Sequence, residues 1–214
     1  MDDSYLQDYR PGIQICIILD GMGDFNFYFS WGWDHIISRE ALDHILFIAA
    51  LAVVFEWARW KNLLVLVTAF TIGHFITLWL TVLGRMEFAS AWVEFLIPLT
   101  IVITALVNLT ANTKVKSIRI HYALALCFGL VHGMGYANTI RFSLLDEQSL
   151  GWSLLAFNLG LELGQLLVVL VILLLGEMAN RYTKIGRRRW VEFSSVIILL
   201  LSLAMAFERI PNLN

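Results

Sequence analysis

Residues 152–176, and within them the run FNLGLELGQ (residues 157–165), decide which kind of fold this chain can adopt. About 25 almost uninterrupted apolar residues are enough for a helix to cross a lipid bilayer. At 100° per residue, Asn158, Glu162 and Gln165 share one face of this helix, whereas Gly160 and Gly164 lie on the opposite face. The two glycines allow a second helix to approach closely. An ionised carboxylate at the centre of a membrane costs roughly 2.5 kcal/mol or more, so Glu162 requires a partner.

The rest of the chain is equally apolar. Of its 214 residues 59% are hydrophobic and 15% are charged, and the mean hydropathy is +0.73. Soluble domains are about one quarter charged, so the composition indicates an integral membrane protein with one domain. A net charge of -2 without a basic patch gives no sign of nucleic-acid binding. Cys16 and Cys127 are far apart and predict no disulfide.

Six apolar segments predict an all-α bundle of six transmembrane helices. They cover about 41–58, 62–83, 92–109, 119–138, 152–176 and 190–207. Residues 1–40 are rich in aromatic side chains and predict an interfacial or re-entrant cap, and residues 208–214 form a short tail. Ten of the 15 Lys and Arg residues lie in the first, third and fifth loops. The positive-inside rule therefore predicts that these loops are cytoplasmic and that the cap and both termini are outside.

With this topology, four histidines and two acids fall in the outer half of the bundle. They are His35, Asp43, His44, His74, His132 and Glu162. A single buried histidine is typical of packing, but ionisable groups within a membrane are rare and usually functional. Imidazoles with carboxylates suit zinc, nickel, cobalt, copper(II) or iron(II), and the two acids would offset the charge of a divalent ion. The sequence therefore predicts a metal site.

A polar path toward the cytoplasmic end is formed in this topology by Asn158, Gln165 and His121. His121 has a second interpretation, as a residue at the membrane boundary.

Four segments resemble the signature blocks of the HupE/UreJ family of bacterial membrane proteins, which are associated with hydrogenase and urease accessory functions. These segments are LDHILF (42–47), TAFTIGH (68–74), FGLVHGMGYA (128–137) and FNLGLELGQ (157–165). The resemblance implies a multi-pass nickel or cobalt permease of the bacterial inner membrane. It also implies that the matching residues Asp43, His44, His74, His132 and Glu162 are the candidate ligands.

The first functional hypothesis is a transporter or facilitator for Ni²⁺ or Co²⁺, with the metal ion and the lipid bilayer as partners and the oligomeric state left open. The alternative is an intramembrane hydrolase with a zinc cofactor and with Asp43 or Glu162 as general base. Haem ligation by paired histidines is a third interpretation, and a metal sensor or assembly partner is a fourth.

Overall fold

The structure is a computed structural model that describes residues 25–38, 41–86, 89–110, 118–144, 150–182 and 186–211. All regular elements in these ranges are helical, so the predicted all-α class is confirmed there. The elements are a helix over residues 25–37, α2 (Leu42–Ala52), the 3-10 helix η3 (Trp57–Arg59), α3 (Trp60–Val82), α4 (Ser90–Thr110), α5 (Ile118–Leu144), α6 (Leu150–Tyr182) and α7 (Arg187–Glu208). Most of the predicted cap (residues 1–40), with Cys16, and the last three residues of the predicted tail lie outside the described residues.

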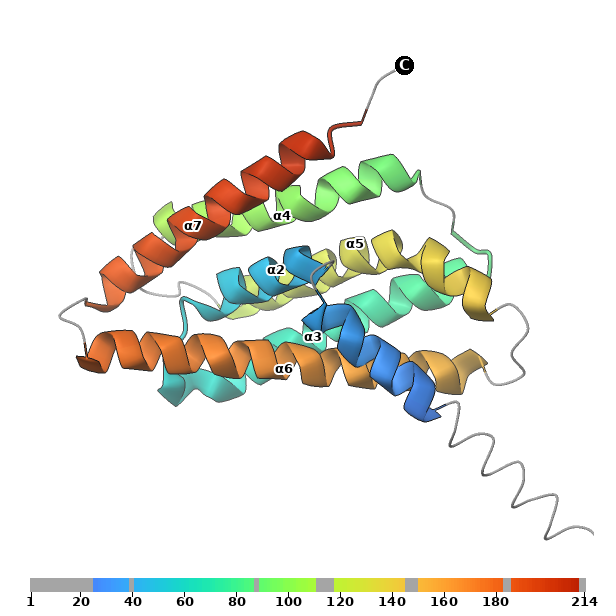
Figure 1. Cartoon of the computed structure of the whole chain (residues 1–214), viewed down its shortest axis with the longest axis horizontal. Coiled ribbons are helices and arrows are strands. Elements are labelled where there is room, and N and C mark those ends of the chain that lie inside the picture. The colour runs from blue at the N-terminus through green and yellow to red at the C-terminus, as the bar shows by residue number, and fades with distance from the viewer. Residues whose placement is uncertain are drawn as a thin grey trace, which may run out of the picture.

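The long helices form a bundle in which successive helices run in opposite directions (Figure 1). α4 packs against α7, and α3 packs against both α5 and α6. One end of the bundle carries η3 and is called the Arg59 end below. The other end is where α7 finishes and is called the Glu208 end; it lies on the right in Figure 1. The start of the helix over residues 25–37 also faces the Glu208 end.

Four segments of the described chain are long and apolar enough to cross a membrane. They are η3 with α3, then α4, α6 and α7. The prediction of a helical membrane protein is therefore confirmed at this level, whereas six crossings are not established. α2 has 11 residues and is shorter than the predicted span 41–58. It ends at Ala52, and Glu56 is already in an extended conformation before η3 begins.

The helix over residues 25–37 and α2 follow each other from the Glu208 end toward the Arg59 end (Figure 1). Thirteen and eleven residues correspond to about 20 Å and 16 Å of helix, so each is shorter than the roughly 30 Å of a hydrocarbon layer. They are separate helices, the first ending at residue 37 and the second beginning at Leu42. Ile36 is completely buried and Tyr28 nearly so, which shows that the helix over residues 25–37 packs into the bundle.

Backbone carbonyls near the end of α2 are satisfied by side chains from other helices. Asn108 on α4 donates from Nδ2 to the carbonyl of Ala50 at 2.7 Å. Arg187 at the start of α7 donates to the carbonyl oxygens of Val53 and Phe55. A helix can end inside an apolar bundle only if such groups find partners, so these contacts explain how α2 stops at Ala52.

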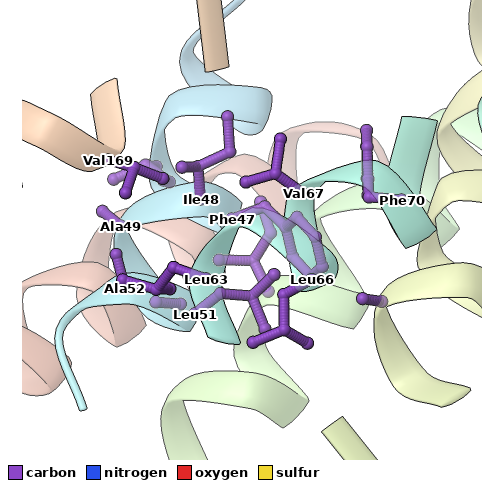
Figure 2. Packing of buried hydrophobic residues seen from close by; sticks show 14 of the residues in the cluster. Phe47, Ile48, Ala49, Leu51, Ala52, Leu63, Leu66, Val67, Phe70 and Val169 are labelled. Atoms are coloured by element: carbon purple, nitrogen blue, oxygen red, sulfur yellow. The ribbon is translucent and has the colours of Figure 1, made fainter. Parts of the chain in front are cut away.

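The apolar core lies between α2, α3 and their neighbours, on the Arg59 side of the histidines. Figure 2 shows Phe47, Leu51, Leu66 and Phe70 pointing toward one another from α2 and α3. Val169 contributes from α6.

Glycines set the closest helix contacts. A Cβ atom on Gly160 would overlap the backbone of Phe29, and one on Gly32 would overlap the backbone of Phe157. The face with Gly160 and Gly164 was predicted to admit a close neighbour, and that neighbour is the helix over residues 25–37. A Cβ on Gly129 of α5 would likewise overlap the backbone of Phe70 on α3.

Candidate metal site

Four histidines from four helices meet in the middle of the bundle. His35 comes from the helix over residues 25–37, His44 from α2, His74 from α3 and His132 from α5. The ring centroid of His44 is 4.8 Å from that of His35 and 4.8 Å from that of His132. The ring of His74 is 6.1 Å from His44 and 6.3 Å from His35. His74 and His132 are completely buried.

Hydrogen bonds fix the orientation of two of these rings. Nδ1 of His44 lies 2.9 Å from Oδ1 of Asp43, which also accepts the backbone N–H of His44 at 2.8 Å. Nδ1 of His132 lies 2.9 Å from the carbonyl oxygen of Phe128. A carbonyl oxygen and a carboxylate can only accept, so both Nδ1 atoms donate, and in a neutral imidazole this leaves the lone pair on Nε2.

Five of the six remaining ring nitrogens have no hydrogen-bond partner within the described part of the chain. These buried atoms are Nε2 of His35, His44 and His132 and both nitrogens of His74. A buried polar atom without a partner costs about 1–3 kcal/mol, so a group of them in one place calls for a ligand. One nitrogen each from His35, His44 and His74 already lies within 4.8 Å of the other two. Metal–nitrogen bonds of about 2 Å would draw them closer by a small rotation of each ring.

The Asp43 carboxylate lies behind His44 and makes two different contacts. Its Oδ1 orients the imidazole, which is the carboxylate–histidine arrangement found behind many metal-binding histidines. Its Oδ2 forms an ion pair with Nη1 of Arg209 at 3.3 Å. Asp43 is buried. In this geometry it positions a ligand and supplies negative charge next to the histidines.

Aromatic rings enclose the four histidines from both sides. Phe47 and Phe70 lie 5.3 Å and 5.2 Å from the ring of His132. The ring of Tyr136 is tilted against that of His35 with 3.9 Å between the centroids, and Phe157 lies 5.8 Å from the same ring. The site is therefore a polar centre in an apolar shell, where an ion would be held without bulk water.

Glu162 is placed elsewhere in the structure. It is half-buried between α6 and α3 and accepts a hydrogen bond from the hydroxyl of Thr68 at 2.6 Å. The group of close ligand atoms found among the described residues consists of His35, His44 and His74, so it contains neither Glu162 nor His132. Gln165, one turn away, is buried and accepts a bond from Thr71 at 3.1 Å, while its Nε2 has no partner in the described ranges.

The two other predicted path residues lie on opposite sides of the site. Asn158 is next to His74, and its Nδ2 donates to the carbonyl of Leu154 at 2.8 Å. His121 is near the start of α5, where its ring lies 6.3 Å from Phe55. Eleven residues of helix, about 16 Å, separate it from His132.

Arg209 and Tyr136 were not predicted from the sequence. Arg209 is a single basic residue after an apolar helix, a pattern typical of a residue that reaches the lipid headgroups. Tyr136 lies in the same signature segment as His132. Its contact with the ring of His35, 101 positions earlier in the chain, could not be predicted from the sequence.

The helices and the buried imidazoles together define a helical membrane protein with a buried cluster of histidines. The family model for HupE/UreJ proteins matches residues 14–209, nearly the whole chain. The chain therefore belongs to the HupE/UreJ family, as the four signature segments predicted. No curated protein matched in a search of such sequences, and no solved structure matched either.

Proposed function

We propose that the protein is a transporter or facilitator for Ni²⁺ or Co²⁺ that holds the ion between His35, His44, His74 and His132. The observation that carries this proposal is the group of buried ring nitrogens without partners, two of whose rings are oriented by hydrogen bonds at Nδ1. Imidazole nitrogens suit late first-row divalent ions, and family membership favours nickel or cobalt among them.

Charge supports a divalent guest that passes through rather than one that stays. Neutral imidazoles alone would leave both positive charges uncompensated in an apolar interior. The Asp43 carboxylate offsets one of them. With Asp43 as the one nearby carboxylate, a divalent ion would keep one uncompensated positive charge in the site. This favours release of the ion over permanent retention.

The proposed route runs from the Glu208 end, past the rings of His35 and Tyr136, to the four histidines. From there it continues along Gln165 toward the level of His121 at the Arg59 end. Gln165 supports this direction because its Nε2 has no partner in the described structure and it lines a cavity of water size among apolar residues. In this proposal the Glu208 end and both termini face the outside of the bacterial inner membrane. In this proposal Glu162 contributes to the route from its position at the contact between α6 and α3, where it accepts a hydrogen bond from Thr68.

The zinc hydrolase receives no specific support from the geometry. Such an enzyme needs a carboxylate free to act on a metal-bound water. Asp43 is engaged with His44 and Arg209, and Glu162 is bonded to Thr68. The transporter is therefore the function proposed.

Uptake of ⁶³Ni²⁺ into proteoliposomes tests the proposal. The wild type is expected to take up the ion, and His44→Ala is expected to abolish uptake because it removes the central imidazole. Cys127→Ser, which changes an exposed thiol on α5, is the control and should transport normally. Absence of uptake by the wild type under every imposed pH or ion gradient would refute the proposal.

A further inference from the structure

We propose that Arg209 is a tethered counter-cation: it neutralises Asp43 while the histidine site is empty and leaves Asp43 when a divalent ion binds. This inference rests on the proposed metal site and concerns its regulation.

The contact that carries the inference is the ion pair between Nη1 of Arg209 and Oδ2 of Asp43, 3.3 Å long. The other oxygen of Asp43 is already used by His44, so Arg209 takes the acceptor that remains. Arg209 also lies near enough to His132 to repel a positive charge there. Its guanidinium therefore already neutralises the carboxylate that would otherwise attract an incoming cation.

The charge balance favours release of the guanidinium on metal binding. In the empty site the charges of Asp43 and Arg209 cancel. A divalent ion would raise the net charge of this apolar region to two if Arg209 stayed and to one if it left. Excess charge in a low-dielectric interior is costly, so the ion and the guanidinium compete.

The position of Arg209 in the fold allows its side chain to move from Asp43 to the protein surface. It is the residue that caps the C-terminal end of α7, directly after Glu208. The side chain of Arg209 is 31% exposed, against 10% for that of Asp43. A rotation of this long side chain moves the charge to the surface without moving a helix.

Calorimetric titration of the detergent-purified full chain with Ni²⁺ tests the competition. Arg209→Gln is expected to bind Ni²⁺ about tenfold more tightly, within the usual range for coupling between two sites. Arg209→Lys keeps the charge and should bind as the wild type does. Arg188→Gln is the control, because it removes the same charge from an exposed pair with Glu192 near the start of α7. Equal or weaker binding by Arg209→Gln would overturn the inference.

A double-mutant cycle assigns the effect to Asp43. In an Asp43→Asn background, Arg209→Gln should change the affinity less than twofold, since the pair no longer exists. A tenfold gain that persists in this background would contradict the assignment.

Chemical labelling of the wild type provides a measurement that needs no variant. Phenylglyoxal followed by mass spectrometry should label Arg209 faster when Ni²⁺ is bound, while labelling of Arg188 stays constant. Unchanged or slower labelling of Arg209 would overturn the release step. If the wild type binds no Ni²⁺ at all, the proposed function itself fails, which is a different outcome from Ni²⁺ binding without any effect at Arg209.

Discussion

Asp43 is the residue whose role the structure makes most specific. Its Oδ1 accepts from both the backbone and the ring of His44, so it fixes which nitrogen faces the other histidines. Asp43→Asn removes the charge and weakens this control, and loss of such a supporting group typically costs 10- to 100-fold in metal affinity. We expect a loss of this size in Ni²⁺ titrations. Glu94→Gln removes one exposed carboxylate from the start of α4 and is the control. Equal affinities for the two variants would contradict the role given to Asp43.

Individual residues also show what a sequence can and cannot predict about a buried site. Depth along a helix follows from counting residues, and this placed the four histidines at one level. His35 and His44 are nine residues apart, about 13 Å in a continuous helix, yet their rings are 4.8 Å apart. The two histidines lie on separate helices, one ending at residue 37 and the other beginning at Leu42, and no breaking residue such as proline marks this boundary in the sequence.

Glu162 illustrates the other difficulty, which is direction around the helix. It shares a face with Asn158 and Gln165 to within about 60°. At the radius of a side chain this angle is enough to turn Glu162 toward Thr68, at the edge of the contact with α3. The angular position of a residue on a helical wheel does not determine which neighbouring side chain it contacts when two lie close together on the same face. The partner of Glu162 could therefore be predicted to exist but could not be identified.

At the scale of elements, the contact between α6 and the helix over residues 25–37 controls the position of His35. Gly160→Val would push side-chain atoms into the backbone of Phe29 and move that helix away. Overpacking of this kind costs about 1–3 kcal/mol, so the melting temperature should fall. Ni²⁺ affinity should fall to the level of His35→Ala. The control is Gly186→Ala, because no atom lies within 4 Å of a Cβ added there. Normal Ni²⁺ affinity in Gly160→Val would show that His35 does not depend on this contact.

The end of α2 depends on a side chain from α4. Asn108→Ala leaves the carbonyl of Ala50 without its 2.7 Å hydrogen bond, and a buried acceptor without a partner costs about 1–3 kcal/mol. We expect a loss of this size in the free energy of unfolding, measured by titration of the purified protein with sodium dodecyl sulfate. Thr110→Ala should have little effect, because its exposed hydroxyl bonds only to carbonyls of its own helix. Equal stability of the two variants would exclude Asn108 as the cap of α2.

The elements themselves were predictable where their signal was length and apolarity. α3, α4, α6 and α7 each coincide in their central part with a predicted span. α2 was predicted too long, because residues 53–58 are as apolar as the helix before them except for Glu56. What stops α2 is a set of hydrogen bonds from Asn108 and Arg187, residues about 60 and 130 positions away in the chain. Only tertiary structure reveals such an end.

At the scale of the whole molecule, the arrangement fixes which connections share an end but not which side of the membrane that end faces. Arg59, Lys61 and Arg187 lie at the Arg59 end, whereas α7 finishes at the opposite end (Figure 1). The positive-inside rule turns this asymmetry into a prediction that the Arg59 end is cytoplasmic. Single cysteines introduced as Arg59→Cys and Glu208→Cys test it, in a background with Cys16→Ser and Cys127→Ser. Both positions are exposed, so a reagent on the correct side can reach them.

A membrane-impermeant maleimide added to intact cells is expected to label the Glu208→Cys protein and to leave the Arg59→Cys protein unlabelled. Both should react after the membrane is permeabilised, which is the control for reactivity. Five helices, α3 to α7, lie between the two positions, so the positions face opposite sides of the membrane only if an odd number of these helices cross it. Labelling of both in intact cells would thus refute the prediction that all five of these helices cross. Labelling of Arg59→Cys alone would reverse the orientation, and Arg209 and the aromatic cover of His35 would then face the cytoplasm.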